Sequence, residues 1–479
     1  MNIFEKKHIH FVGAGGIGIS ALVKFFLSKG AEATCSDQKP GATLNDLEKH
    51  GATIFVGHDA KNIPENTDLV VYSSAVPKDN PELLFAESRN IPLLDYPQAL
   101  GEVMKGYHGI AVSGTHGKTT TTSLLGKILE RAGMDPLVVV GGKVPGWDGN
   151  LRLLEKTETE KIFVAEACEY RRNMLSLSPQ MLVLTNIEAD HLDYYRDLDD
   201  VMNAFETFIQ KLPEDGTLVV NADDSNTVKA AKTGHARKLF YSLRDKTADL
   251  YAQDVHPAEQ NGFLGQTFRL SWQGEDLGEF FLSLPGEFNV SNALAASLAA
   301  LSLGAEKEAI RDALADFHGT WRRFEKIAER DGAVIYTDYA HHPTAVAKTL
   351  AGARSQYSDK KILAVFQPHQ RDRTKNLFDD FVNAFGDADG VLFSEIYDVP
   401  GREENIQISS QDLAEAFRKK YQKPVWYAKD LSETQEKILA LIPEYEVVLI
   451  MGAGDIYEMA MSLVPEPSEK VLEENLVKF

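Results

Sequence analysis

Residues 109–122 read GIAVSGTHGKTTTT, a short β-rich run followed by a glycine turn and the polar start of a helix. This order predicts a strand, a tight phosphate-binding turn and a helix whose N-terminus faces the phosphate. Lys118 is then placed to reach the β- and γ-phosphates of a nucleotide, and the Thr119 hydroxyl is placed to bind Mg2+. The turn is shorter than the usual P-loop, because the position five before Gly117 is Val112 and not glycine.

A second glycine-rich turn occurs near the N-terminus, in HFVGAGGIGIS, residues 10–20. Gly13, Gly15 and Gly18 follow a strand-like run and open an amphipathic helix, which brings backbone N–H groups to a phosphate. Asp37 follows the strand-like EATCS, where a dinucleotide-binding fold has its ribose-binding acid. Taken alone, this loop favours a nicotinamide-dependent dehydrogenase. The alternative is a turn that serves only to pack the helix on the sheet.

Along the chain, short apolar runs alternate with helical patterns, which is typical of parallel α/β sheets. We expect three α/β domains: a Rossmann-like domain over residues 1–107, a central P-loop ATPase-type domain over 108–321 and a Rossmann-like domain over 322–479. Residues 249–284 break the alternation and predict a small antiparallel sheet within the central domain. The strand candidates are HIHFVG, LVVYSS, GIAVSG, IFVAEA, MLVLTN, AVIYTD, KILAVFQ, GVLFSEI and VVLIMGAG.

Composition excludes several classes of function. The 479-residue chain has a formal net charge of -21, which argues against nucleic-acid and anionic-membrane partners, since both are bound mainly by clustered Lys and Arg. Its two cysteines, Cys35 and Cys168, lie far apart in sequence and do not indicate a disulfide framework. The N-terminus has no apolar signal core, and no apolar run approaches the ~20 residues of a membrane-spanning helix. We therefore expect a soluble cytoplasmic protein.

Polar residues follow two strands of the predicted central sheet. Glu166 ends the strand IFVAE, and Asp190 and His191 follow the strand MLVLTN. In open α/β sheets ligands bind beyond the carboxyl ends of the strands, so these side chains are expected near the phosphate turn. Mg2+ at such a turn needs oxygen ligands from neighbouring strands. The sequence predicts that Glu166 and His191 complete a metal site with Thr119.

Two further clusters lie in the C-terminal third. DYAHHP, residues 338–343, follows a strand and has Pro343 at the expected first position of a helix. QPHQRDR, residues 367–373, follows the strand KILAVF, and its arginines suit a carboxylate or phosphate. WRRFE, residues 321–325, lies at the expected domain hinge, where Arg322 or Arg323 could reach a nucleotide phosphate. The alternative for the first two clusters is ordinary loop polarity.

Taken together, these motifs resemble those of the Mur ligases in kind and in order, over the whole chain. Chance would not order so many short motifs in this way. Within the family, the pattern is most similar to the branch that joins L-alanine to UDP-N-acetylmuramate in peptidoglycan synthesis. The motifs are HFVGAGGIGIS, SSAV with NPE after it, GTHGKTTTT, EACEYRRN, NIEADHLDYY, NVSNALAA, WRRFE, DYAHHP, FQPH and GAGDI.

The resemblance implies that two glycine loops serve two nucleotides, so the first loop implies no NAD. The N-terminal domain would hold UDP-N-acetylmuramate, the central domain ATP with Mg2+, and the C-terminal domain L-alanine. The implied reaction activates the lactyl carboxylate as an acyl phosphate, which the amine of L-alanine then attacks. The implied partners are these small molecules, without nucleic acid or membrane, in a monomer or homodimer.

By the same resemblance, individual residues take roles. For catalysis these are Lys118, Glu166, His191 and His341, and the implied metal ligands are Thr119, Glu166 and His191. For ATP they are Gly114, Thr115, His116, Gly117, Lys118, Thr119, Thr120, Asn289, Asn292, Arg323 and Asp338. For the UDP-sugar they are Gly13, Ala14, Gly15, Gly16, Ile17, Gly18, Asp37, Ser73, Ser74 and Ala75. For the amino acid they are Tyr339, His341, Arg371 and Arg373.

Three positions depart from the commonest family pattern. EACEYRRN replaces an acidic EADESD form, although Glu166 keeps its place. Glu287 and Phe288 precede Asn289 where histidine is frequent, and Gln370 stands where the first of two arginines is common, with Arg371 beside it as a substitute.

Two alternatives remain at this stage. Within the family, a recycling ligase that attaches a tripeptide to the same sugar nucleotide would share nearly every ATP motif. Outside it, a Rossmann-type oxidoreductase or a UDP-sugar-binding protein would keep the first loop and tolerate loss of Lys118, Glu166 and His191. All three residues are present, which favours a ligase.

Overall fold

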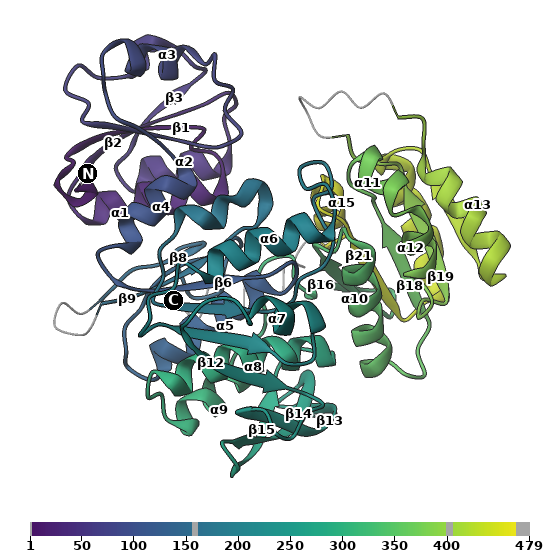
Figure 1. Ribbon diagram of the computed structural model, residues 1–479. Coiled ribbons are helices and arrows are strands. Elements are labelled where there is room, and N and C mark those ends of the chain that lie inside the picture. Colours follow the sequence, from purple (N-terminus) through teal and green to yellow (C-terminus); the bar gives the residue numbers. More distant parts are fainter. Residues whose placement is uncertain (1, 156–160, 399–405, 466–479) are drawn as a thin grey trace, which may run out of the picture. The chain divides into compact units, whose positions relative to one another are not determined.

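A computed structural model describes residues 2–155, 161–398 and 406–465 of the chain. It has a three-domain α/β architecture with one mainly parallel sheet in each domain (Figure 1). One compact unit comprises the first sheet and most of the second, in Met1–Val255, Thr267–Leu282 and Asn289–Trp321. The second unit comprises the third sheet, from Arg322 onward, together with His256–Gln266 and Ser283–Phe288. Among the helices of the described ranges, none is both long and apolar enough to span a lipid bilayer. The α/β fold class and the nine strand candidates are confirmed.

The N-terminal domain has a five-stranded sheet in the order β3-β2-β1-β4-β5, in which all pairs are parallel. The strand order reverses between β1 and β4, and a ligand crevice is expected beyond their carboxyl ends. The strands are β1 (His8–Val12), β2 (Glu32–Asp37), β3 (Thr53–Val56), β4 (Leu69–Tyr72) and β5 (Leu93–Asp95). The helices are α1 (Ile17–Ser28), α2 (Ala42–Lys49), α3 (Pro81–Ser88) and α4 (Tyr96–Met104).

Alternating side chains bury both faces of this sheet. Phe11 of β1 packs with α1 on one face, whereas Val12 and Val70 pack with Leu83 of α3 on the other. Figure 1 shows α3 on one side of the sheet and α1 and α2 on the opposite side. A strand buried on both faces is expected to be apolar throughout, as LVVY of β4 is, and β1 departs from this at His8 and His10.

The central domain has a ten-stranded sheet in the order β15-β14-β13-β12-β11-β10-β6-β9-β7-β8. The strands expected over residues 249–284 form, and they continue this sheet beyond β12 at its edge. The strands are β6 (His108–Ser113), β7 (Leu137–Val139), β8 (Leu151–Arg152), β9 (Ile162–Glu166), β10 (Met181–Leu184), β11 (Thr217–Asn221), β12 (Arg237–Ser242), β13 (Leu250–Gln260), β14 (Phe263–Trp272) and β15 (Glu275–Leu282). The helices are α5 (Lys118–Arg131), α6 (Leu198–Ile209), α7 (Ser225–Ala230), α8 (Glu287–Ser302) and α9 (Lys307–Ala315), with a 3-10 segment η3 (Tyr170–Ser176).

The C-terminal domain has a six-stranded sheet in the order β16-β17-β21-β18-β19-β20. Only β16 runs antiparallel to its neighbour, and the other pairs are parallel. The strands are β16 (Glu325–Arg330), β17 (Ala333–Asp338), β18 (Ile362–Phe366), β19 (Gly390–Ser394), β20 (Val425–Ala428) and β21 (Val447–Met451). The helices are α10 (Pro343–Gln356), α11 (Arg371–Asn376), α12 (Phe378–Asn383), α13 (Ser410–Tyr421), α14 (Leu431–Leu441) and α15 (Ile456–Met461).

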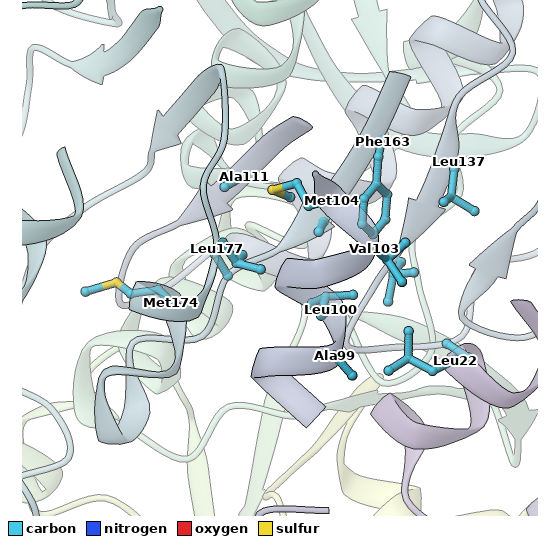
Figure 2. Close-up of a cluster of buried hydrophobic side chains, with 14 of the residues drawn as sticks. Leu22, Ala99, Leu100, Val103, Met104, Ala111, Leu137, Phe163, Met174 and Leu177 are labelled. Atoms are coloured by element: carbon cyan, nitrogen blue, oxygen red, sulfur yellow. The ribbon is translucent and has the colours of Figure 1, made fainter. Parts of the chain in front are cut away.

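Helix α4 joins the cores of the first two domains. An aspartate and a glutamine form a capping box at its N-terminus, and its apolar side chains are buried. On one side it packs near Leu22 of α1, and on the other it reaches Ala111 of β6 and Phe163 of β9 (Figure 2). Both sheets therefore share one continuous apolar core, which fixes the distance between their carboxyl ends.

The close packing of α4 against η3 gives a stability prediction. A Cβ atom at Gly101 would overlap the backbone carbonyl oxygen of Ser176. Because backbone cannot move aside as a side chain can, we expect Gly101→Ala to destabilise the protein by about 3 kcal/mol or more. The midpoint of thermal unfolding should fall by at least roughly 5 °C.

The matched control is Gly41→Ala, since Gly41 has open space around its Cα and an extended φ of -170°. It should change the free energy of unfolding by less than about 1 kcal/mol. Equal midpoints for the two variants would contradict the close approach of α4 to η3.

Candidate active site

The first glycine loop is closed by its own sheet. The Gly13 N–H donates to the carbonyl oxygen of Ser36 at 2.8 Å, and the Gly15 N–H donates to Asp37 Oδ2 at 2.9 Å. Gly13 has a φ of +76°, and a Cβ at Gly15 would lie 2.8 Å from the same carboxylate oxygen. Both positions therefore require glycine. The ribose-binding role expected for Asp37 stays a prediction, because here the carboxylate holds the loop.

The other residues assigned to the UDP-sugar gather around this loop. Ser73, Ser74 and Ala75 follow β4, where the Ser73 N–H donates to the carbonyl oxygen of Val12 at 2.9 Å. Ala14, Gly16 and Ile17 complete the turn into α1. The sequence-predicted set thus gathers at the carboxyl ends of β1, β2 and β4, although its ligand stays a prediction.

Tyr96 at the start of α4 connects this loop with the second one. Its ring lies so close to Gly18 that a Cβ there would come within 2.8 Å of the ring carbon Cζ. Burial, together with the negative charge of Glu166 at the end of β9, raises the pKa of Tyr96. Tyr96 therefore packs on the first glycine loop and lies near enough to Glu166 for that charge to act on its phenol.

A buried carboxylate lies beneath the first loop. Asn80 and Pro81 cap and open α3, which places Glu82 inside the domain with no exposed side-chain surface. Its carboxylate accepts hydrogen bonds from Ser36 Oγ and Asn62 Nδ2, both at 2.6 Å. Burial alone would raise the pKa of Glu82, but its contacts with His10, Ser36 and Asn62 outweigh burial and lower the pKa to about 2. Because Ser36 adjoins Asp37, this cluster supports the loop.

The second glycine loop is held by the segment after β10. Gly114 and Gly117 have φ values of +141° and +83°, which only glycine adopts readily. The Thr115 N–H donates to the carbonyl oxygen of Asn186 at 2.9 Å, and the His116 N–H donates to Asn186 Oδ1 at 2.9 Å. The turn is thus fixed before any phosphate binds.

Lys118 is largely buried at the start of α5. Its Nζ donates to the carbonyl oxygens of Gly114 at 2.6 Å and Thr115 at 3.0 Å, and lies 2.8 Å from Glu169 Oε2. Burial alone would lower the pKa of Lys118, but the charge of Glu169 outweighs it and raises that pKa. The sequence did not single out Glu169. Its signal was the spacing EACE, which places a second glutamate three residues after Glu166.

Thr119 and Glu166 come together as expected for a metal site. Thr119 Oγ1 donates to Glu166 Oε1 at 3.1 Å, and Glu166 Oε2 accepts the Gly141 N–H at 2.7 Å. A hydroxyl and a carboxylate are hard oxygen ligands of the kind that Mg2+ prefers, so this donor set fits the ion. His191, with a φ of +55°, instead has Nε2 3.4 Å from Glu169 Oε1. Its shared metal site with Glu166 stays a prediction.

Two asparagines of α8 face the second loop. Asn292 lies against Gly117, so closely that a Cβ on the glycine would overlap its side-chain oxygen. Asn292 Nδ2 also lies 3.3 Å from Asn289 Oδ1, and both side chains are buried. Thr120 is buried at the first turn of α5. The structure thus brings these three predicted residues to the phosphate turn, and their contact with ATP stays a prediction.

In the C-terminal domain, Asp338 ends β17 and accepts the N–H groups of Phe324 at 2.8 Å and Ala340 at 2.7 Å. Burial raises its pKa, with Arg323 opposing that change. The Arg323 guanidinium lies 5.1 Å from the centre of the Tyr339 ring. Arg322, the alternative phosphate ligand, lies between two tyrosine rings and donates to the carbonyl oxygen of Gly452 at 2.5 Å, a structural role.

The residues assigned to the amino acid lie beyond β17 and β18. His341 Nδ1 lies 2.9 Å from the carbonyl oxygen of Tyr339, and its ring centre is 6.0 Å from that of His369. Tyr397, which the sequence did not indicate, stacks on His369 with ring centres 5.5 Å apart. It lies 28 positions after His369 in the sequence, and no local motif marks it.

The two predicted arginines of this domain differ. Arg371 forms a bidentate pair with Asp398, with Nε–Oδ1 and Nη2–Oδ2 distances of 2.8 and 2.9 Å. Arg373 is buried on α11. Gln370 is buried with a φ of +73° and donates its N–H to the carbonyl oxygen of Tyr397 at 3.1 Å. A carboxylate ligand of Arg371 would have to share it with Asp398, so its role in amino-acid binding stays a prediction.

Comparison with known families accounts for nearly the whole chain. The Mur ligase family catalytic domain matches residues 8–108, the Mur ligase middle domain matches 112–300, and the Mur ligase glutamate ligase domain matches 322–454. The three domains follow one another in the order of the three sheets.

Individual relatives are similar over their full lengths. The UDP-N-acetylmuramate–L-alanine ligase of Caldanaerobacter subterraneus subsp. tengcongensis is 39% identical over 470 residues, with 98% of each chain covered. The crystal structure of the UDP-N-acetylmuramate-alanine ligase of Thermotoga maritima has a TM-score of 0.78 at 27% identity, covering 99% of this chain and 100% of the other. A murein peptide ligase of Psychrobacter arcticus has a TM-score of 0.69 at 24% identity, and the match covers 96% of this chain and 100% of the other. This likeness shows a shared fold.

The buried carboxylate beneath the first loop gives a pH-dependent prediction. Because folding lowers the pKa of Glu82 from about 4.5 to about 2, its contribution to stability is present above the higher value and is lost as pH falls toward the lower one. Glu82→Gln should therefore lower the free energy of unfolding by up to about 3 kcal/mol at pH 6 and by progressively less toward pH 3.

Urea unfolding of both proteins at several pH values measures this difference. Glu87→Gln, an exposed position on the same helix, is the control and should match the unaltered protein. A gap between Glu82→Gln and the unaltered protein that stays constant from pH 6 to pH 3 would show that the carboxylate charge is not responsible.

The Lys118–Glu169 pair gives a second prediction. In Glu169→Gln the ammonium stays buried without its counter-charge, which should destabilise the ligand-free protein by about 3 kcal/mol. The phosphates of bound ATP would supply the negative charge that the Glu169 carboxylate no longer provides. Thermal unfolding should therefore show a larger rise of the midpoint on adding ATP and Mg2+ to Glu169→Gln than to the unaltered protein.

Glu102→Gln, which removes a surface pair with Lys105, is the control. It should leave the midpoint of the ligand-free protein, and the rise of that midpoint on adding ATP and Mg2+, within experimental error of the unaltered protein. An ATP-induced rise no larger in Glu169→Gln than in the unaltered protein would mean that phosphates do not take over the role of Glu169.

Proposed function

The chain belongs to the Mur ligase family, and we propose that it joins L-alanine to the lactyl carboxylate of UDP-N-acetylmuramate, with conversion of ATP to ADP and phosphate. This is a ligase reaction of peptidoglycan precursor synthesis. The observation that carries the proposal is the presence of two preformed glycine loops in one compact unit, whose cores helix α4 joins. The full-length relative from Caldanaerobacter carries the name of this activity.

The reaction needs activation because a carboxylate is unreactive toward amines. A carboxylate oxygen attacks the γ-phosphorus of ATP and ADP leaves, which gives an acyl phosphate. The amine of L-alanine then attacks the carbonyl carbon. Collapse of the tetrahedral adduct releases phosphate together with the former carboxylate oxygen, and the amine loses a proton.

In the first step two anions must approach each other, so catalysis rests on neutralising charge and on positioning. Lys118 is the buried cation of the phosphate loop, and its release from Glu169 toward the γ-phosphate would supply that charge. Bound Mg2+ would neutralise further phosphate charge, held by Thr119 and Glu166 and, by family resemblance, His191. Asn289 and Asn292 would contact ATP from the α8 side of the loop.

The C-terminal domain would supply the amino acid. His341 and Tyr339 present polar atoms at the carboxyl end of β17, beside the His369 and Tyr397 rings. Arg323 and Asp338 would meet the nucleotide, and Arg371 and Arg373 would meet the carboxylate of L-alanine. Exclusion of water from the acyl phosphate requires that the domains close over the ligands.

The alternatives are less well supported. The function of a Rossmann-type oxidoreductase would not account for the second glycine loop with Lys118 and its buried partner Glu169. The tripeptide-recycling branch has support here from a shared fold, whereas the L-alanine branch has support from 39% identity over the full length.

Phosphate release tests the proposal. With ATP and Mg2+ present, release should require both UDP-N-acetylmuramate and L-alanine, and should not occur with the tripeptide or with other amino acids at comparable concentrations. Release that occurs only with the tripeptide would move the protein to the recycling branch. Release that does not depend on the sugar nucleotide would remove the ligase proposal.

The division of labour between the two loops gives a variant test. Lys118→Ala should lower the turnover number by at least about 100-fold, while the Kd for UDP-N-acetylmuramate, measured by calorimetry, stays within about two-fold. Lys127→Ala, nine residues along the same helix and paired with Glu130 at 3.2 Å, is the matched control. If Lys118→Ala lost turnover and sugar-nucleotide binding to the same extent, the assignment of the two loops to different nucleotides would be contradicted.

A further inference from the structure

The backbone is strained at two successive positions in the first turn of η3, which follows β9 in the chain. Arg171 has φ and ψ of 52° and 24°, and Arg172 has 61° and 24°. Both lie in the left-handed region, where a residue with a Cβ costs about 1 kcal/mol or more. Such strain persists at functional sites when the surrounding structure holds it. Arg171 follows Glu169, the partner of Lys118 in the phosphate loop, by two residues.

The two arginines have different surroundings. The Arg172 guanidinium lies 2.6 Å from Asp200 Oδ1 and over the ring of Tyr195, so its charge is already compensated. Arg171 is exposed, and its guanidinium lies 5.3 Å from the centre of the Tyr170 ring. Within residues 2–155, 161–398 and 406–465, no carboxylate lies within 4 Å of it. Arg171 is therefore a cation available to a ligand.

The ring of Tyr170 relates Arg171 to the reaction centre. Its centre lies 4.7 Å from that of His191, and its hydroxyl donates to Asp193 at 3.0 Å. His191 in turn lies 3.4 Å from Glu169, the partner of Lys118. Tyr170 thus fixes the arginine beside the phosphate site, and the cation–π contact limits the directions in which the guanidinium extends.

Segment η3 also lies against the N-terminal domain. The carbonyl oxygen of Ser176 packs on Gly101 of α4, and Tyr96 of the same helix reaches the first glycine loop. Arg171 therefore lies on a segment that approaches Lys118 through Glu169 at one end and α4 through Ser176 at the other.

We propose that Arg171 binds the lactyl carboxylate of the sugar nucleotide and orients it toward the γ-phosphate. The inference rests on the proposed function, whose substrate is the source of the carboxylate. A planar guanidinium pairs with a carboxylate through two parallel hydrogen bonds, which fixes orientation as well as charge. Glu166 and Glu169 make the surroundings acidic, so a carboxylate needs such a cation to approach.

The test uses two variants of Arg171 and a matched control. Arg171→Gly removes the side chain while glycine accepts the left-handed backbone without strain, so the fold is preserved. Arg171→Lys keeps the charge and loses the bidentate geometry. Arg196→Ala removes a positive charge from an arginine with an 82% exposed side chain, paired only at 3.7 Å with Asp200.

Calorimetry compares two ligands that differ in the lactyl carboxylate, UDP-N-acetylmuramate and UDP-N-acetylglucosamine. We expect Arg171→Gly to weaken binding of the first by roughly 10- to 100-fold and of the second by less than about two-fold. Arg171→Lys should lie between Arg171→Gly and the unaltered protein, and Arg196→Ala should match the unaltered protein. In phosphate release, KM for UDP-N-acetylmuramate should rise while KM for ATP stays constant.

Equal weakening of both ligands would assign Arg171 to the diphosphate or the sugar and overturn the proposal. A rise of KM for ATP alone would overturn it too, as would unchanged binding. Phosphate release by the unaltered protein separates these results from failure of the function itself. If that release does not depend on UDP-N-acetylmuramate, the proposed function falls and the role of Arg171 falls with it.

Discussion

A buried ammonium group requires nearby negative charge, and around Lys118 this requirement organises the loops of the central domain. Lys118 lies between two carbonyl oxygens of its own turn and the carboxylate of Glu169. Glu169 is in turn close to His191, and its carbonyl oxygen accepts the Tyr195 hydroxyl at 2.5 Å. The segments after β6, β9 and β10 are therefore tied together at one point. A phosphate that binds Lys118 must replace Glu169, so ligand binding changes the connection among all three.

A second constraint is the shared core of the first two domains. Helix α4 buries its apolar side chains in both, and the ring of Tyr96 at its start packs against Gly18 of the first glycine loop. The two glycine loops are consequently carried by sheets whose cores are joined through one helix. A reaction between two anionic substrates benefits from this rigidity, since orientation is then established before the chemical step.

Much of the fold follows from local patterns. Apolar runs that end in glycine or polar residues identified the strands, and each glycine loop appeared between a strand and a helix. The position of Glu166 near its loop followed from the rule that ligands gather at the carboxyl ends of parallel strands. That of Asp37 followed from the dinucleotide-binding pattern, and that of Asn292 from the family resemblance. What these side chains contact there did not follow, because pairing depends on distances of a few ångströms between segments far apart in sequence.

Particular residues show this limit. Asp37 accepts the Gly15 N–H, Arg371 is paired with Asp398, and His191 approaches Glu169 and not Glu166. Glu169 lies in the EACEYRRN motif, yet only its burial and its contact with Lys118 reveal that it pairs with the lysine of the phosphate loop. The left-handed backbone of Arg171 is also invisible in sequence, since arginine does not favour that conformation.

The acyl-phosphate route is tested most directly by isotope transfer. UDP-N-acetylmuramate labelled with 18O in both oxygens of its lactyl carboxylate is converted with ATP and L-alanine, and the released phosphate is analysed by mass spectrometry. Transfer of the γ-phosphoryl group to the carboxylate predicts one 18O atom in each phosphate and one in the amide product. Phosphate without 18O would contradict activation of the carboxylate by ATP.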